Sequence, residues 1–263
     1  MTQPTNNQSQ GSNGPEGSAD SSTKQTRIRS LALSFTLDGD SIERIPLDEA
    51  LNAPLEEAKP IRGLSFYRGQ SYHGGWYWSS TTGAHVSYES RLELAHLIQA
   101  DFDPEVVGIV AQPFRLHWRE GGKPYRHVPD YLYVLANGRR RIVNVTLPQY
   151  ADRPRKVRSQ RACAAAAKRL GWSSTTLGLP DMAYLRNLHL LSQARGASWN
   201  VAQYEKAILE AASRRVPIGE LIHCVGQPAL TKPAVLSLLW HHRLRADLSV
   251  LLNPDTLVWR SGR

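Results

Sequence analysis

The chain has 263 residues, a formal charge of +9 and a sequence pI of about 9.8. This length allows one large domain or two modest ones with a hydrophobic core, and the positive charge favours polyanionic partners. Its two cysteines, Cys163 and Cys224, exclude a disulfide framework and a cysteine-based zinc site. No apolar run approaches the ~18 residues of a membrane span, and no signal-peptide pattern opens the chain. We therefore expect a cytoplasmic protein without membrane partners.

The N-terminal part differs in composition from the rest. Residues 1–26 are mostly Gln, Asn, Ser, Gly and Thr, which bury too little apolar surface to offset the entropy of ordering. We therefore predict a disordered tail over 1–60 that holds one short hairpin. In this hairpin, within Ile28 to Leu47, apolar residues alternate from Leu31 to Leu37 before an Asp38-Gly39 turn. A short helix is predicted over 48–55.

Residues 61–195 alternate between helical and strand patterns. The apolar spacing predicts a helix over 87–100, with Ser87 or Ser90 as its N-cap. The next predicted elements are strands over 106–112, 114–118, 125–136 and 140–147, a helix over 158–170 that ends at Gly171, and a strand over 173–177. This order predicts an α/β core in which a mixed sheet is flanked by helices.

Helical patterns dominate from residue 181 onward, and residues 196–263 form a second predicted domain. Helices are expected over 182–193, over 200–213 with Asn200 as cap, over 218–225, and over 232–240 with Thr231 as cap. Two strands, over 244–248 and 256–259, would follow. Helix, short helix, helix and a terminal strand pair is the outline of a winged helix, so we expect a small helical, winged-helix-like C-terminal domain.

The positive charge is concentrated in one stretch. Residues 1–60 carry 5 basic and 9 acidic side chains, whereas residues 115–169 carry 14 basic and 3 acidic ones. This stretch is either a solvated basic face or a surface that contacts phosphates. On the second interpretation the candidate DNA-contacting residues are Arg126, Arg139, Arg140, Arg141, Arg153, Arg155, Lys156 and Arg158.

Three polar positions are candidates for metal chemistry. Glu93 lies inside an apolar predicted helix, Asp130 precedes an apolar strand, and Asn144 lies in the next strand. Such groups can converge on Mg²⁺, which binds few carboxylates and leaves positions for phosphate oxygens and an activated water. Asn144 and Thr146 are two apart and so share one face of the strand. The alternative is that Glu93 is a solvated helix residue and Asp130 a turn residue.

Two histidines near these positions have simpler interpretations. Glu93 and His96 form a Glu-x-x-His pattern, but a di-iron bundle needs two copies and two further Glu residues, so we predict a structural His96. His127 is predicted to be a surface or half-buried residue, although it lies close to Asp130 in the sequence.

Several motifs occur in a fixed order along the middle of the chain. They are Tyr88-Glu89-Ser90-Arg91-Leu92-Glu93-Leu94-Ala95, Asp101-Phe102-Asp103-Pro104-Glu105-Val106-Val107, Ala111-Gln112-Pro113-Phe114, His127-Val128-Pro129-Asp130-Tyr131-Leu132 and Val143-Asn144-Val145-Thr146-Leu147-Pro148. This set resembles TnsA, the endonuclease subunit of heteromeric transposases. Tyr67-Arg68-Gly69-Gln70 and Trp76-Tyr77-Trp78-Ser79 extend the resemblance, which covers roughly residues 64–195.

The resemblance implies a restriction-endonuclease-like PD-(D/E)XK core that holds Mg²⁺, with Mn²⁺ as a substitute. Carried over by motif, the ligands would be Glu93, Asp130 and Asn144, and Glu89 would lie behind Glu93. TnsA is similar in tolerating an amide at the third position. The family's role is to cut the 5′ ends of a transposon. Its partners are a TnsB-like DDE transposase, which cuts and joins the 3′ ends, and a TnsC-like AAA ATPase, which regulates both.

The chain departs from the family at Thr146, where the family has the catalytic Lys. A lysine there orients the attacking water and stabilises developing negative charge, whereas a threonine hydroxyl carries no charge. Arg141, Lys123 and Lys156 are the candidate replacements. The first hypothesis is therefore an Mg²⁺-dependent DNA endonuclease with Glu93, Asp130, Asn144 and Thr146 at its site. The second is a DNA-binding scaffold that no longer cuts, and the third is a winged-helix regulator.

Overall fold

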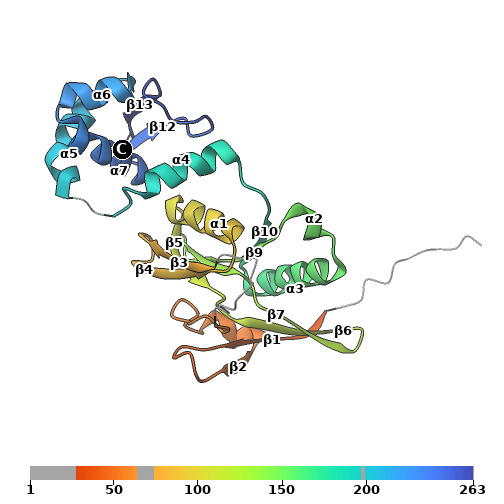
Figure 1. Ribbon diagram of the computed structural model, residues 1–263. Coiled ribbons are helices and arrows are strands. Elements are labelled where there is room, and N and C mark those ends of the chain that lie inside the picture. The colour runs from red at the N-terminus through yellow and green to blue at the C-terminus, as the bar shows by residue number, and fades with distance from the viewer. Residues whose placement is uncertain (1–27, 64–73, 197–198, 263) are drawn as a thin grey trace, which may run out of the picture.

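The computed structural model describes residues 28–63, 74–196 and 199–262, and in these ranges the chain is an α/β protein with mixed sheets and seven α-helices (Figure 1). The predicted disordered segment over 1–26 and the Tyr67-to-Gln70 motif lie outside the described residues. Among the described helices, none has both the length and the apolar character needed to cross a bilayer.

The central sheet has the strand order β10-β9-β8-β5. Its strands are β5 (Val106–Ala111), β8 (Tyr131–Leu135), β9 (Arg140–Val145) and β10 (Ser173–Leu177). Strand β10 is parallel to β9, and the other neighbours are antiparallel. Because successive strand residues point to opposite faces, Val143 packs with Leu97 of α1 (Arg91–Phe102), and Ile142 packs with Ala162 of α3 (Pro154–Leu170). The sheet therefore lies between α1 and α3.

A second sheet, of order β2-β1-β6-β7, packs on the far side of α3. It consists of β1 (Arg29–Phe35), β2 (Glu43–Pro46), β6 (Arg115–Glu120) and β7 (Lys123–His127). The hairpin predicted within 28–47 is confirmed as β1 and β2. Its side chains Leu33 and Phe35 are buried in the core, so the tail predicted over 1–60 is folded from residue 28 at the latest.

The remaining N-terminal elements lead into the central sheet. A 3-10 helix, η1 (Leu47–Leu51), replaces the helix predicted over 48–55. The hairpin β3 (Gly75–Ser79) and β4 (Ala84–Tyr88) precedes α1, and the buried Asp101 of α1 fixes it. Its carboxylate accepts hydrogen bonds from Tyr77 Oη (2.8 Å), Ser79 Oγ (2.7 Å) and the Thr81 N–H (2.8 Å).

The C-terminal part packs against α1 rather than standing apart. Its helices are α4 (Met182–Ser192), α5 (Trp199–Ala211), α6 (Ile218–Val225) and α7 (Pro228–Trp240). Three short strands, β11 (Val216–Pro217), β12 (Leu244–Ala246) and β13 (Leu257–Arg260), form a sheet of order β11-β13-β12. The ring of Phe102 contacts Trp240, and His242 Nε2 lies 2.7 Å from the Phe102 carbonyl oxygen.

Local chemistry corrects several predicted boundaries. The strand predicted over 125–136 is two strands, because Val128-Pro129-Asp130 interrupts it and proline cannot donate to a ladder. The last long helix begins at Pro228, so the predicted cap Thr231 is buried within it and donates to the Gly226 carbonyl. Helix α5 begins at Trp199, so Asn200 is inside the helix. Ser90, the alternative cap, starts α1, and α3 ends at Gly171 with φ at 68° as predicted.

Candidate functional site

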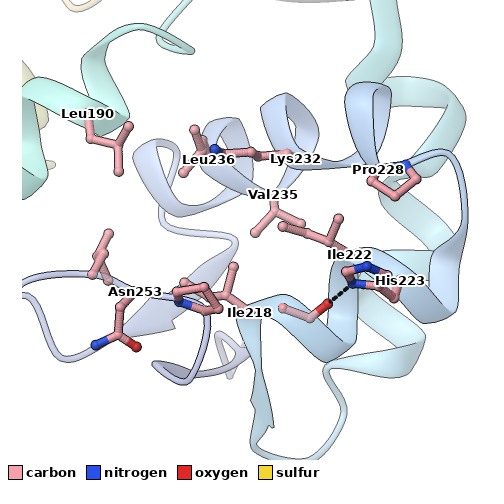
Figure 2. Close-up of a pocket in the computed structure, with 12 residues that line it drawn as sticks. Leu190, Ile218, Ile222, His223, Pro228, Lys232, Val235, Leu236 and Asn253 are labelled. Carbon is pink, nitrogen blue, oxygen red and sulfur yellow. Dashed lines mark hydrogen bonds between the residues drawn. The ribbon is translucent and has the colours of Figure 1, made fainter.

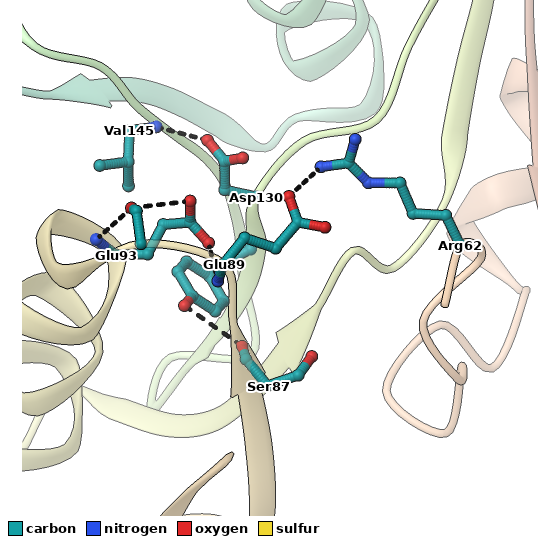
Figure 3. A network of polar contacts seen from close by, with 8 residues as sticks. Arg62, Ser87, Glu89, Glu93, Asp130 and Val145 are labelled. Atoms are coloured by element: carbon teal, nitrogen blue, oxygen red, sulfur yellow. Dashed lines mark hydrogen bonds and ion pairs between the residues drawn. The ribbon is translucent and has the colours of Figure 1, made fainter. Parts of the chain in front are cut away.

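Two carboxylates lie close together where strand β8 of the central sheet begins. Asp130 lies just before β8, and its Oδ2 accepts a 2.6 Å hydrogen bond from the N–H of Val145 in β9. Glu93 lies in the first turn of α1, where its Oε1 accepts from Ser90 Oγ (3.0 Å) and its Oε2 from the Glu89 N–H (2.8 Å). Figure 3 shows both side chains directed toward the same space. We call Glu93 and Asp130 the acidic pair.

Burial and mutual repulsion set the protonation of the acidic pair. Burial raises the pKa of Asp130, the negative charge of Glu93 raises it further, and the result is about 7. Burial also raises the pKa of Glu93, against the lowering effect of its hydrogen bonds from Glu89 and Ser90. A cation between the two carboxylates would remove this repulsion. The donor set therefore suits a hard cation held by few carboxylates.

Asn144 lies next to the pair but is directed to another partner. It is buried, and its Oδ1 accepts a 2.6 Å hydrogen bond from His127 Nε2, while its Nδ2 has no hydrogen-bond partner. The amide oxygen expected to bind metal is thus occupied by His127. In the described ranges no group of three or more His, Cys, Asp and Glu side chains is arranged to hold a metal ion. Glu93 and Asp130 fit the implied Mg²⁺, and Asn144 would have to give up His127 to join them.

Thr146 lies just after β9, on the same face as Asn144. It is buried, and its N–H donates to the Leu177 carbonyl at 2.9 Å. Because residues two apart share a face, Asn144 and Thr146 point to the same side of β9 as Ile142, the side covered by α3. A threonine there supplies a hydroxyl and no charge.

The three candidate replacements for the missing lysine lie in different parts of the structure. The positive charge of Lys156, in the first turn of α3, lowers the pKa of both Asp130 and His127. Arg141 instead lies opposite Tyr133, on the α1 side of the sheet, and Lys123 begins β7. Lys156 is therefore the candidate that lies near the acidic pair.

A second cation at the site was not predicted. Arg62 forms a 2.7 Å ion pair with Glu89, and its charge lowers the pKa of Glu93, Asp130 and His127. Arg62 lies at the start of the domain predicted over 61–195, and no local pattern distinguishes it from a solvated arginine. His127 is half-buried, one of the two placements predicted for it, and its ring lies against Asn144.

Several of the predicted DNA-contacting arginines have other partners. Arg140 binds Glu56 with its Nε (2.7 Å) and Nη2 (2.8 Å), and its guanidinium lies over the ring of Trp172. Arg158 pairs with Glu120 (3.4 Å) and lies over Tyr125. These two arginines therefore connect elements of the fold, and their contact with DNA stays a prediction. Arg155 and Lys156 both lie close enough to lower the pKa of His127.

His96 is structural, as predicted. It is buried, its Nε2 lies 2.7 Å from the Gly178 carbonyl oxygen, and its Nδ1 lies 2.9 Å from Gln99 Oε1. The ring thus joins α1 to the segment after β10.

A separate cavity of about 360 Å³ lies in the C-terminal part, between α4, α6 and α7 (Figure 2). Its lining is mostly apolar and includes Leu190, Ile218, Ile222 and Val235. His223 lies on its rim, with Nδ1 2.7 Å from the Gly219 carbonyl oxygen. This lining offers no arrangement of acids or bases comparable to the acidic pair.

The chain matches no protein-family model and no curated protein.

Proposed function

We propose that the chain is the DNA endonuclease subunit of a heteromeric transposase, similar to TnsA, that hydrolyses phosphodiester bonds with Mg²⁺. In this proposal it cuts transposon 5′ ends beside a TnsB-like DDE transposase, under the control of a TnsC-like AAA ATPase. The observation that carries the proposal is the acidic pair, because Glu93 and Asp130 come from motifs 37 residues apart in the sequence and meet at one buried point beside cations.

The element order is compatible with the proposed core. Helix α1, the antiparallel strands β5, β8 and β9, helix α3 and the parallel strand β10 follow one another in the order expected from the sequence, with Glu93 in α1 and Asp130 just before β8. The order α5-β11-α6-α7-β12-β13 is compatible with a winged helix. We assign this C-terminal unit to DNA or to the ATPase partner.

Mg²⁺, when bound, would supply Lewis acidity and an activated water. Glu93 and Asp130 would hold it, and the Val145 N–H keeps the Asp130 carboxylate in place. Arg62 balances the negative charge of Glu89 at the rim. Burial lowers the pKa of His127, which donates to Asn144. These residues form a charged, partly buried cluster suited to a phosphate group.

We assign to Lys156 the charge that the family places at position 146. Strands β9 and β10 are parallel neighbours, so α3, which connects them, runs in the opposite direction. Its first turn therefore lies over the carboxyl end of β9, on the face that carries Thr146. From there the Lys156 ammonium would stabilise negative charge developing on the phosphate.

Plasmid nicking tests the proposal. The wild-type chain, Asp130→Ala, Lys156→Ala and the matched control Lys168→Ala, an exposed residue of the same helix, are compared with Mg²⁺ or Mn²⁺ and the TnsB-like partner. We expect wild type and Lys168→Ala to nick equally, Asp130→Ala to be inactive, and Lys156→Ala to lose roughly 10²–10³ in rate, the usual effect of deleting one preorganised donor. Equal rates for Lys156→Ala and Lys168→Ala would refute the role of Lys156.

The second candidate is a DNA-binding scaffold that does not cut. It is favoured by Thr146 and by the hydrogen bond that occupies the Asn144 oxygen. Thr146→Lys separates the two candidates. If only this variant nicks, the site is intact but the natural chain is a scaffold. If wild type nicks and Asp130→Ala does not, the enzyme assignment holds.

A further inference from the structure

The sheet β2-β1-β6-β7 has two chemically different faces. Its inner face carries Leu33, Phe35, Leu116 and Trp118, all buried against α3 and the central sheet. Strand alternation sends the intervening residues to the outer face. The charged residues on that outer face are all basic.

The strand register places these basic residues side by side. Arg29 pairs with Arg119, Ser34 pairs with both Arg44 and Arg115, and His117 pairs with Arg126. Directly opposed residues share a face. A bulge between Arg29 and Ala32, where Ser30 has φ at 54°, keeps Arg29 opposite Arg119. The outer basic face consists of Arg29, Arg44, Arg115, His117, Arg119 and Arg126.

Among the described residues, no carboxylate forms an ion pair with the outer basic face. Within residues 28–63, 74–196 and 199–262, none of its five arginines forms an ion pair, whereas Arg140, Arg158 and Arg169 each pair with a carboxylate. Burial lowers the pKa of His117, and the charges of Arg44, Arg115 and Arg126 lower it further, with no carboxylate acting against them. The other residues that face outward, Ala32, Ser34, Pro46 and Pro124, are small and uncharged.

These features favour a nucleic-acid backbone over other anions. Strands spaced about 4.8 Å apart spread the arginines over a nearly flat area roughly 15 Å wide. Duplex DNA presents a dense, regular row of phosphates, which arginine binds with two parallel hydrogen bonds. A membrane surface would also need apolar side chains to insert, and this face has none of appreciable size.

We propose that the outer basic face binds the phosphate backbone of duplex DNA. The face is distinct from the cleavage site, because Tyr125, which contacts Arg158 of α3, and His127, which contacts Asn144, point to the inner side of the same hairpin. The chain would therefore hold DNA on both sides of β6 and β7. This inference does not depend on whether the chain cuts DNA.

The experiment is a DNA-binding titration in EDTA, which keeps any nuclease inactive. Anisotropy of a short fluorescein-labelled duplex is measured over about 50–200 mM salt for wild type and for the triple variant Arg44→Ala, Arg115→Ala, Arg126→Ala. The matched control, Lys59→Ala, Lys168→Ala, Arg186→Ala, removes three exposed charges elsewhere. Each phosphate contact adds about −0.9 to the slope of log K against log salt. We therefore expect the triple variant to lose about two to three from this slope and the control to lose less than one.

Two further measurements keep the inference falsifiable. In the unmodified chain, DNA should protect Arg44, Arg115 and Arg126 from phenylglyoxal, as read by mass spectrometry, and should leave Arg186 reactive. Vesicles of phosphatidylserine should give no such protection. Equal slopes for the triple variant and the control, no protection by DNA, or protection by vesicles alone would each overturn the proposal.

Discussion

At the scale of single residues, Asp130 is a carboxylate held where its charge is disfavoured. Burial and the neighbouring Glu93 raise its pKa to about 7 from 3.8. The folded chain thus binds this proton more tightly than the unfolded chain does. The contribution of Asp130 to stability is therefore most favourable below pH 4, and it is lost as the pH rises toward 7.

The loss of stability as Asp130 ionises leads to a prediction for the metal-free protein. Asp130→Asn retains an acceptor for the Val145 N–H but cannot ionise. In EDTA we expect the variant to be more stable than wild type at pH 8, by up to about 4 kcal/mol, and the difference to shrink toward pH 5. Urea unfolding at both values checks it. Parallel stability curves for the two proteins would contradict the assignment of burial and repulsion to Asp130, and Mg²⁺ should stabilise only wild type at pH 8.

At the scale of elements, one set of hydrogen bonds at the start of α1 both caps the helix and holds the carboxylate of Glu93. Ser90 Oγ caps the helix by accepting from the Glu93 N–H (3.1 Å), and it donates to Glu93 Oε1 (3.0 Å). The same contacts that begin the helix fix the carboxylate proposed to hold the metal. The position of Glu93 is therefore set by contacts within residues 89–93.

Removing the cap tests this double role. Ser90→Ala should lower the free energy of unfolding by about 1 kcal/mol, because an N–H of the first turn loses its acceptor, and it should also reduce nicking. Ser90→Thr, which keeps the hydroxyl, is the control and should behave like wild type in both assays. Urea denaturation and plasmid nicking provide the two readouts. Full nicking by Ser90→Ala would separate the cap from the site.

At the scale of the whole molecule, the two halves of the chain share one apolar core. Trp240 of α7 is buried, its ring contacts Phe102 of α1, and its Nε1 donates to Ser80 Oγ at 3.2 Å. Asn187 of α4 bonds the Leu248 and Val250 carbonyls with its Nδ2, at 2.9 and 2.7 Å. The C-terminal unit is thus joined to α1, the helix that carries Glu93.

Truncating the joining side chain measures this coupling. Trp240→Ala should lower the free energy of unfolding by about 3–5 kcal/mol, because it leaves a cavity between α1 and α7. Trp240→Phe keeps most of the packing, so we expect a smaller loss, within about 1.5 kcal/mol. Chemical denaturation followed by far-ultraviolet circular dichroism compares them. Equal losses for the two variants would show that the ring contact contributes little.

Short-range chemistry is what the sequence determined by itself. Apolar spacing located α1 and α3, Gly171 marked the end of α3, and the two elements of the hairpin over 28–47 followed from alternation. The resemblance to TnsA named Glu93 and Asp130 as partners, and the structure brings them together. These features depend on neighbours in the chain or on motif order, so they are visible without the fold.

The tertiary structure decided which charges are paired and which face each one occupies. The basic stretch over 115–169 is divided by strand alternation, because Arg126 points outward while its neighbour His127 points to Asn144. Arg29 and Arg44, from the hairpin predicted over 28–47, join the outer basic face because β1 pairs with the distant strand β6. Arg140 instead forms an ion pair with Glu56. Sheet pairing joins residues that are far apart in the sequence, so no local pattern carries this information.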